Sequence, residues 1–472
     1  MSRLSRWMCR CLSLLAVAAL IVALGCQESP RPKPKLPPKP AVAAKAPESK
    51  PAAKAEAKPE EKKGEEAKPE EKKEEKKEEA KEEKKELEEK AEKKKPEEPK
   101  AEEKKEEKKA EAKEEKKPEA KEEKESAEAK PAKAEQPQVP EAKPLKKPEL
   151  LVELPDHCNT PDGMCVLPDG SVIVSVPNFN DKKAPPLLVK ITKDNEVEDF
   201  LKLPPHPETK RMGPMGIRPA PNGDLYLADN QLFHHRDGKT SLYGKSRLVR
   251  IKMKDGKPDG LVVVANGINV ANAVAIHDGY VYLTETILVP DSKPLKSGVF
   301  RFKLDEQDVQ MQTPLHKDPH LILTLESTNP IPFGADGICF DKEGNLYVNL
   351  FADAVIRKIR LDKEGKVLSN VIFAKAPFMK SCDGMDYDPR TNKIYVADLL
   401  GNAVHAVSME GKVQTLAANG DTDGSDGQLD APCEALVRGN TIVVANMDFV
   451  VEGASVNTKF DKPYTISVIK LD

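Results

Sequence analysis

The chain has 472 residues, of which 33% are charged, and its formal net charge at neutral pH is −3. Nearly half of the charged residues lie in residues 27–147, so the overall composition says little about the rest of the chain. That remainder has no basic stripe, which argues against nucleic acid as a partner. It also lacks a phosphate-binding loop, a dinucleotide fingerprint, a serine nucleophile elbow and a Cys–His zinc spacing, which argues against the enzymes that depend on them.

The first 26 residues are typical of an export signal. Three arginines precede an uncharged, mostly apolar stretch at residues 11–24, which is the pattern of a signal peptide. The stretch is too short for a membrane-spanning helix, which needs roughly 20 apolar residues. Its end, Ala23-Leu24-Gly25-Cys26, resembles the lipobox of bacterial lipoproteins. The resemblance implies cleavage before Cys26, lipid on this cysteine, and an exported protein anchored in a membrane of the bacterial cell envelope. The alternative is an ordinary cleaved signal.

Residues 27–147 are of low complexity and consist mainly of Lys, Glu, Ala and Pro. Such a segment has almost no apolar surface to bury, so folding cannot offset the loss of chain entropy. Its positive and negative charges nearly cancel, which distinguishes it from a polybasic arm or an acidic tail. We expect a disordered, extended spacer with transient helix, which holds the folded domain away from the anchored N-terminus.

Residues 148–472 are enough for one large domain. One pattern occurs six times in them: a short apolar run, a polar turn and a second run rich in β-forming residues. Successive copies start roughly 45 to 65 residues apart, which is typical of four-stranded blades. The sequence therefore predicts an all-β domain, a six-bladed β-propeller. Glu149–Leu154 would close the propeller as the outermost strand of the last blade.

The residues that begin the six copies should ring one mouth of the central channel, because blades are arranged radially. These ring residues are Asp162, Met215, Asn272, Asp336, Asp383 and Glu434. Five of them carry side-chain oxygens, a set that suits a hard divalent cation, calcium above all. An alternative exists for the three aspartates, because Asp-Gly before a strand is also ordinary turn chemistry.

Other polar residues should approach the same mouth. The longest insertions follow the second strands of blades two, three and six, so they should share a face with the ring and form binding loops. Residues that end second strands should support the ring or form the pocket wall: Asn230, Glu285, Asn349, Asp398 and Asn446. His234 and His235, in the blade-two loop, are candidates for moving protons, although adjacent loop histidines are more often simply solvated.

With these features, residues 148–472 resemble the senescence marker protein / gluconolactonase / luciferin-regenerating-enzyme family, which is related to NHL-repeat, strictosidine-synthase and paraoxonase propellers. In that family an Asn, an Asp on the next blade and a Glu two blades further on bind one divalent cation in the channel. Asn272, Asp336 and Glu434 follow this cyclic order. The resemblance implies a cation site at these residues and hydrolysis of a lactone or similar ester.

The chemistry of such a cation site indicates how it would work. The cation would polarise the substrate carbonyl and stabilise the developing oxyanion. Asp336, as a cation ligand, and Asp383, as a base for the attacking water, would be catalytic, with Asp162 as the alternative base. We expect a monomer whose loop-rich face takes the substrate.

Three departures from the family keep a second function open. Met215 stands where the family has a substrate-contacting Asn, the Glu434 motif differs from the family motif, and residues 424–432 are closer to NHL repeats. The alternative is a non-catalytic binding module for a protein or glycan, with the metal structural or absent. Residues 421–424 resemble the start of an EF-hand loop but lack its twelfth-position Glu, so an inter-blade loop is the better interpretation.

Five cysteines follow Cys26 in the chain. Cys165 and Cys339 hold equivalent places in first strands and are expected in the core. Cys382 and Cys433 precede ring residues on neighbouring blades. They would form a disulfide in an oxidising compartment only if their Cα atoms came within about 7 Å.

Overall fold

The computed structural model of the chain describes residues 144–181, 183–234 and 242–472. The expected signal segment, Cys26 and nearly all of the expected spacer lie outside these residues. No helix within the described ranges is long and apolar enough to span a membrane. Among the described residues the regular structure is almost entirely β, apart from two short 3-10 helices, η1 (Leu232–His234) and η2 (Leu315–Lys317).

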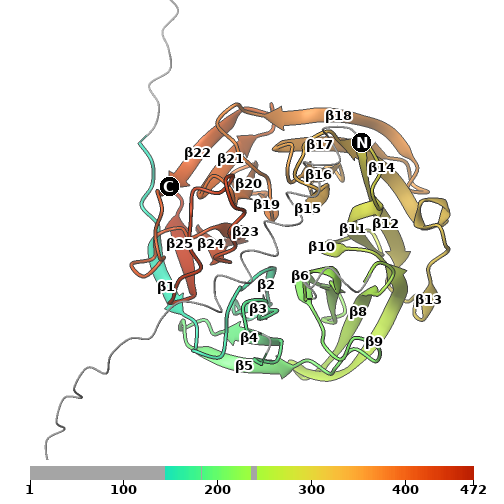
Figure 1. Cartoon of the computed structure of the whole chain (residues 1–472), viewed down its shortest axis with the longest axis horizontal. Helices are drawn as coiled ribbons and strands as arrows, with labels where there is room; N and C mark the ends of the chain where they lie inside the picture. The colour runs from blue at the N-terminus through green and yellow to red at the C-terminus, as the bar shows by residue number, and fades with distance from the viewer. Residues whose placement is uncertain (1–143, 182, 235–241) are drawn as a thin grey trace, which may run out of the picture. The chain divides into compact units, whose positions relative to one another are not determined.

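The strands form six sheets arranged radially around a common centre (Figure 1), so the expected six-bladed propeller is confirmed. From the centre outward, blade one contains β2 (Met164–Val166), β3 (Val172–Val176), β4 (Leu187–Ile191) and β5 (Val197–Lys202). Blade two contains β6 (Pro214–Pro219), β7 (Leu225–Asp229), β8 (Ser246–Lys254) and β9 (Lys257–Ile268), with β13 (Val309–Gln310) added at its edge. Blade three contains β10 (Ala271–His277), β11 (Tyr280–Val289), β12 (Leu295–Lys303) and β14 (Leu321–Ser327).

The remaining blades repeat the same order. Blade four contains β15 (Ala335–Phe340), β16 (Leu346–Leu350), β17 (Val355–Leu361) and β18 (Val367–Lys375). Blade five contains β19 (Met385–Asp388), β20 (Lys393–Asp398), β21 (Ala403–Ser408) and β22 (Val413–Ala418). Blade six contains β23 (Pro432–Arg438), β24 (Thr441–Asn446), β25 (Thr465–Lys470) and, outermost, β1 (Glu149–Glu153).

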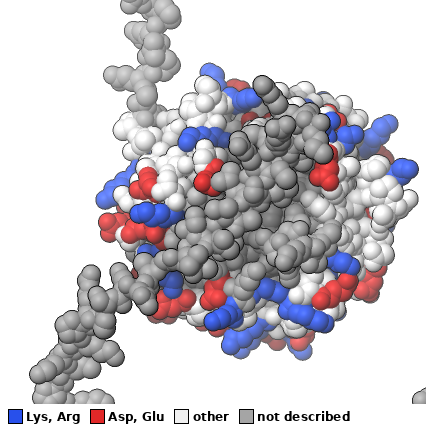
Figure 2. All heavy atoms as spheres, in the orientation of Figure 1, with Lys and Arg blue, Asp and Glu red and all other residues white. Residues whose placement is uncertain are grey.

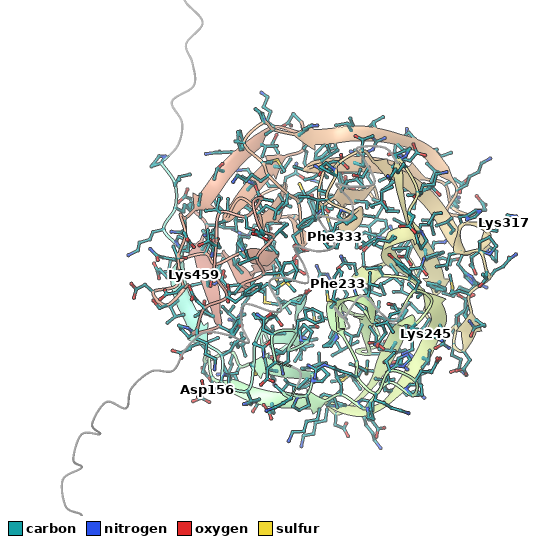
Figure 3. The ribbon with its side chains drawn as sticks, viewed as in Figure 1. Asp156, Phe233, Lys245, Lys317, Phe333 and Lys459 are labelled. Atoms are coloured by element: carbon teal, nitrogen blue, oxygen red, sulfur yellow. The ribbon has the colours of Figure 1, made fainter. Side chains whose placement is uncertain are left out.

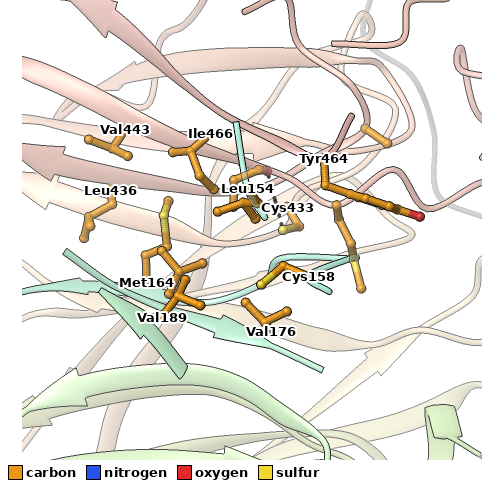
Figure 4. Packing of buried hydrophobic residues seen from close by; sticks show 14 of the residues in the cluster. Leu154, Cys158, Met164, Val176, Val189, Cys433, Leu436, Val443, Tyr464 and Ile466 are labelled. Carbon is orange, nitrogen blue, oxygen red and sulfur yellow. Dashed lines mark hydrogen bonds between the residues drawn. The ribbon is translucent and has the colours of Figure 1, made fainter. Parts of the chain in front are cut away.

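The expected closure by the N-terminal strand is therefore confirmed. β1 pairs antiparallel with β25, from Glu149 opposite Val468 to Glu153 opposite Thr465. Figure 4 shows the packing that supports this sheet: Leu154 and Cys158 lie among side chains of blades one and six, such as Val189 and Ile466. One apolar cluster thus joins both ends of the domain, which makes the ring of blades continuous.

Burial follows position within each blade. The second strands β3, β7 and β16 are buried at every residue, because each lies between two strands and between two neighbouring blades. The outermost strands are more exposed, and β18 leaves Leu368 and Ile372 more than half exposed. On the face shown in Figure 2, Lys and Arg are mixed with Asp and Glu around the rim of the described residues.

Glycines at the centre allow neighbouring blades to approach closely. A Cβ on Gly163 would lie 2.5 Å from the Gly216 Cα, and a Cβ on Gly337 would lie 2.3 Å from the Asp383 carbonyl oxygen. Neither Gly163 nor Gly337 has a positive φ. The Asp-Gly pairs at the ring therefore reflect contact between blades rather than turn chemistry.

All five described cysteines are free and buried. The thiol of Cys433 donates to the Pro161 carbonyl at 3.2 Å, which ties blade six to the segment that enters blade one. Cys382 and Cys433 are separate thiols, so the disulfide considered from the sequence is not formed.

Candidate functional site

Five of the six predicted ring residues line one pocket at the centre of the propeller: Asp162, Met215, Asn272, Asp336 and Asp383. They lie at or just before the start of innermost strands. In blades two, three and four the ladder between first and second strands shifts register at this point, as between Ala271 and Val274. Such a bulge turns a side chain out of the normal alternation.

The three aspartates form a buried acidic group. Burial raises the pKa of Asp162 well above its ordinary value, and the charges of Asp336 and Glu434 raise it further. Burial raises the pKa of Asp336 to about 7. The pKa of Asp383 is raised well above its usual range by burial, by Asp336 and by Asp162. Carboxyls in this arrangement need either protons or a cation.

Asp336 and Asp383 share a hydrogen bond that lowers the pKa of Asp336 and raises that of Asp383. The two carboxyls therefore titrate as a pair that holds one proton between them, and the amide of Asn272, which donates to Asp336 Oδ2 at 2.8 Å, favours the ionised form of Asp336. This arrangement leaves one ionised and one neutral carboxyl side by side, which is how two close carboxyls avoid mutual repulsion.

The hydrogen bonds of Asn272 fix the orientation of its amide. The Thr286 hydroxyl donates to the Ala335 carbonyl at 2.8 Å, so its oxygen is left to accept. The Asn272 Nδ2 group donates to this oxygen at 3.2 Å and to Asp336 Oδ2 at 2.8 Å. The amide nitrogen is thus committed to two protein acceptors, and the carbonyl oxygen is the donor atom that Asn272 can offer to a cation.

Glu434, the sixth ring residue, does not line this pocket. Its Oε2 lies 3.7 Å from Nη1 of Arg218 on β6, and its Oε1 is buried without a hydrogen-bond partner. Burial raises the pKa of Glu434 to about 7, although Arg218 opposes the shift. Glu434 thus has one oxygen beside a fixed cation and one orphaned oxygen, while its charge acts on Asp162 and Asp336.

Arg218 was not identified from the sequence. It donates to the carbonyls of Met164 at 2.5 Å and Ile217 at 3.0 Å, and the carboxylates of Glu434 and Asp386 act on it. A cue existed, because an arginine interrupts the apolar first strand of blade two three residues after Met215. At that distance along a bulged strand the side chain again faces the centre.

The donor atoms of these residues suit a hard cation. Carboxylates and an amide carbonyl are the oxygen donors that calcium prefers, and the orphaned Glu434 oxygen is an unused donor. In the described part of the chain, no three His, Cys, Asp or Glu side chains are grouped closely enough to hold a metal ion by themselves. A cation at this mouth would therefore depend on Asn272 as well as on carboxylates.

The rest of the pocket is apolar. Its wall contains Phe233, Phe333, Phe351, Leu399, Met447 and Phe449. Phe333 contacts Phe233 and Phe351 edge to face, with ring centroids 5.7 Å apart in both pairs. Figure 3 shows Phe233 and Phe333 near the centre of the propeller. Phe233 lies in η1 and Phe449 follows β24, so two of the long insertions supply the wall, as expected for binding loops.

The predicted residues at the ends of second strands have other contacts. None of them is among the residues that line the pocket. Asn349 accepts from Gly337 N at 3.0 Å and donates to the Asp383 carbonyl at 2.5 Å, so it joins two ring segments. Glu285 accepts from three backbone N–H groups, those of Asn269, Val270 and Ile287.

Asp398, Asn446 and Asn230 likewise accept hydrogen bonds from backbone N–H groups. Asp398 accepts from the backbone N–H groups of residues 380, 381 and 401, and Asn446 accepts from Asp430 N at 3.1 Å. In blade two the equivalent hydrogen bond is made by Asp229, which accepts from Gly213 N at 2.8 Å. Asn230 instead accepts from Leu232 N and orders η1. His235 lies outside the described residues, and for His234 only its backbone position in η1 is described.

Comparisons with known proteins extend to structure alone. No family model and no curated protein matches the chain. Similar solved structures include a luciferin-regenerating enzyme, with 11% identity, a TM-score of 0.46 and coverage of 69% of this chain and 97% of that one. The calcium-binding protein regucalcin from Agrobacterium tumefaciens has 14% identity, a TM-score of 0.45 and coverages of 69% and 96%.

A gluconolactonase from Xanthomonas campestris has 13% identity, a TM-score of 0.43 and coverages of 70% and 96%.

Proposed function

We propose that this propeller is a hydrolase that holds a divalent cation, calcium by preference, at its channel mouth and cleaves a lactone or similar ester with an apolar body. One observation carries the proposal: buried carboxyls and an oriented amide share a single pocket with an aromatic wall. The lipobox-like end of the signal segment supports a place of action at the bacterial cell envelope.

The cation would be held by Asn272, Asp336 and Glu434. Asn272 offers a carbonyl oxygen because its amide nitrogen is occupied, and Glu434 offers the oxygen that has no hydrogen-bond partner. When bound, the cation would supply the positive charge that polarises a substrate carbonyl and stabilises the oxyanion.

Asp383 is the residue placed to move a proton. It shares a proton with Asp336, and positive charge beside Asp336 would favour loss of this proton. The Asp383 carboxylate would then accept a proton from an attacking water and return it to the leaving alkoxide. Asp162 faces the same pocket and would add negative charge that keeps the attacking water oriented.

The pocket wall favours an apolar substrate. Phenylalanine side chains bury apolar surface and offer no hydrogen-bond donor, and Met215 places a thioether where a sugar hydroxyl would need an amide. An alkyl or aryl lactone or ester therefore fits this wall better than a sugar lactone does.

A substrate panel tests the activity. The purified full-length chain would be assayed with aryl esters, alkyl-substituted lactones and a sugar lactone, with calcium or with EDTA. We expect calcium-dependent hydrolysis of apolar substrates, and a loss of at least about a hundredfold in kcat for Asp383→Asn, as is typical for a general base. If no substrate is hydrolysed, the catalytic proposal fails.

Thermal unfolding tests the cation separately. A ligand that binds only the native state stabilises it by about 2.7 kcal/mol at a hundredfold excess over Kd, so calcium should raise the melting temperature. Asp336→Asn should lose most of the response from this site. Met215→Ala, at a ring position without an oxygen, should keep it. An equal response in wild type and Asp336→Asn would contradict the channel site.

The non-catalytic alternative rests on the same wall. An aromatic pocket on a loop-rich face also suits an apolar side chain of a protein partner. A calcium response without hydrolysis of any substrate would favour this binding module over the hydrolase.

A further inference from the structure

A second buried acidic group lies outside the channel pocket, where the loop before β23 meets the long insertion of blade six. Asp430 precedes β23, Asp448 follows β24, and Asn457 lies within the insertion at residues 447–464. All three are buried, with exposed fractions of 2%, 1% and 1%. None of them lines the channel pocket.

The hydrogen bonds of these residues leave two oxygens unused. Asn457 Nδ2 donates to Asp430 Oδ1 and, at 3.1 Å, to the Thr422 carbonyl. Both partners are acceptors, so the amide nitrogen is correctly oriented and Asn457 Oδ1 is left over. Asp448 Oδ2 accepts from Asp461 N at 2.7 Å. The remaining atoms, Asp448 Oδ1 and Asn457 Oδ1, are buried with no hydrogen-bond partner.

The charges that act on Asp430 and Asp448 are those of other carboxylates. Asp461, Asp423 and Asp421 act on Asp430, and Asp430 and Asp461 act on Asp448. Burial and these neighbours raise the pKa of Asp430 to about 7 and that of Asp448 to about 8. The insertion also carries two lysines: the charge of Lys459 acts on the surface carboxyl of Asp421, and Lys462 extends to Asp156 at 3.3 Å. Two buried carboxyls together with two orphaned oxygens are the features of a cation site.

We propose that Asp430, Asp448 and Asn457 bind a second hard divalent cation, calcium by its preference for oxygen, independently of the channel site. The ligands would be carboxylate oxygens of the two aspartates and the amide oxygen of Asn457. Backbone carbonyls and water would complete the six to eight oxygens that calcium takes. The EF-hand-like residues Asp421 and Asp423 are not ligands, because their carboxylates accept from Thr458 and Ser425 at the surface.

The position of this site gives it a role in shaping the channel pocket. Asp448 stands between Met447 and Phe449, which both line that pocket. A cation that joins Asp448 to Asp430 would fix the start of the insertion against blade six and hold these two side chains in the wall. The site would thus be structural, and its loss would loosen one side of the binding face.

Terbium luminescence can detect the site because a tyrosine lies beside it. Tb³⁺ replaces Ca²⁺ at oxygen sites and emits when a nearby tyrosine is excited. Tyr464 is 7% exposed, and the charges of Asp448 and Asp430 act on its hydroxyl. The full-length chain titrated with terbium chloride should show saturable emission that calcium chloride displaces. Tyr464→Phe should lose most of this emission while calcium still binds.

The variants separate this site from its neighbours. Asp448→Asn and Asp430→Asn should weaken terbium binding at least about tenfold, because carboxylate charge sets the affinity of such sites. Asp426→Asn, an exposed acid of the same loop, should bind like wild type. Asn457→Ser, which keeps both charges, gives a second route if the aspartate variants fail to fold, and it too should bind more weakly.

Three outcomes would overturn the proposal: no saturable emission, emission unchanged by both Asp448→Asn and Asn457→Ser, or emission that Tyr464→Phe leaves intact. Asp336→Asn keeps the two proposals distinguishable, because it should remove the channel site and preserve the Tyr464-dependent emission. If Asp336→Asn abolishes the emission and Asp448→Asn does not, the signal comes from the channel and the second site is wrong.

Discussion

Arg218 affects the charge balance of the carboxylates at the centre of the propeller. Its guanidinium lies 3.7 Å from Glu434 Oε2, and Asp386 also acts on it. Arg218 thus acts on two carboxylates, whereas the charges that act on Asp162, Asp336 and Asp383 are those of other carboxylates. Arg218 therefore offsets part of the acidic charge at the centre, and the rest, which includes the unpartnered Oε1 of Glu434, remains for protons or a bound cation.

Replacing Arg218 with methionine tests this role. Arg218→Met leaves Glu434 and Asp386 without their cation, and breaking a buried pair in this way costs about 3–5 kcal/mol of unfolding free energy. Urea unfolding at pH 8 in EDTA would measure the loss. The loss should shrink at pH 5, where Glu434, with a pKa of about 7, is protonated.

The exposed Arg360 offers a matched control. Arg360→Met should change the free energy of unfolding by less than about 0.5 kcal/mol. If Arg218→Met is no more destabilising than this control, Arg218 does not neutralise the buried carboxylates.

At the scale of single residues, the sequence predicted the site residues that recur in each copy of the repeat, but not those that occur in only one copy. Asp162, Asn272, Asp336 and Asp383 were found because each begins a copy of the same pattern, and the blades bring them to one pocket. Arg218 has no equivalent in the other copies. Asp430, Asp448 and Asn457 come from irregular loops, whose meeting depends on tertiary contacts that no local pattern encodes.

At the scale of elements, the centre depends on how closely neighbouring blades approach. The segments that begin the innermost strands of neighbouring blades approach so closely that there is no room for a side chain at Gly163. A Cβ there would lie 2.5 Å from the backbone of Gly216. Residues at the ends of second strands, such as Asn349, then tie adjacent starts together. Sequence reasoning could not distinguish a side chain that lines the pocket from one that accepts hydrogen bonds from the backbone, because both are polar and buried.

Gly163→Ala tests the close approach. The added methyl group would contact backbone that cannot rotate away, so we expect a loss of about 1–3 kcal/mol in the free energy of unfolding, as for other overpacked cores. Gly420→Ala is the control, because Gly420 has nothing within 4 Å of the added Cβ and no positive φ. It should be neutral or slightly stabilising. Equal stabilities for both variants, measured by thermal unfolding, would show that the blades can separate at little cost.

At the scale of the whole molecule, the N-terminal strand has two consequences. β1 completes the last blade, so the propeller closes only after the first and last described strands have paired. The same strand is where residues 27–147 join the domain, so an N-terminal anchor would reach the propeller at the rim of blade six. The repeat pattern was sufficient to predict this closure, because blade six lacks a fourth strand of its own.

The anchor is tested by changing its cysteine. Cys26→Ser should release the protein from the membrane fraction or leave it unprocessed, because lipid attachment requires the thiol. Fractionation of cells that express either form, followed by mass determination of the N-terminal peptide, would show the difference. A Cys26→Ser protein that remains membrane-bound and is cleaved as before would rule out Cys26 as the lipid site, without affecting the propeller.

The buried carboxyls give the whole domain an unusual dependence on pH. Burial raises the pKa of Asp336 and Glu434 to about 7 and that of Asp448 to about 8, whereas in the unfolded chain these groups titrate near their ordinary values. Between about pH 4.5 and 7 the folded protein therefore binds more protons than the unfolded protein. The free energy of unfolding should fall as pH rises through this window, by at most about 1.4 kcal/mol per pH unit for each such group.

Calcium should reverse this trend, because it binds the ionised carboxylates that are unfavourable without it. In EDTA the melting temperature should decline from pH 5 to pH 8, whereas in calcium the decline should flatten, so the calcium-induced shift is largest at pH 8. Asp336→Asn combined with Asp448→Asn removes one group from each proposed site and should reduce both the slope in EDTA and the calcium shift. A melting temperature that rises from pH 5 to pH 8 in EDTA would contradict this account, because it would mean that the buried carboxyls are already balanced by charges within the protein.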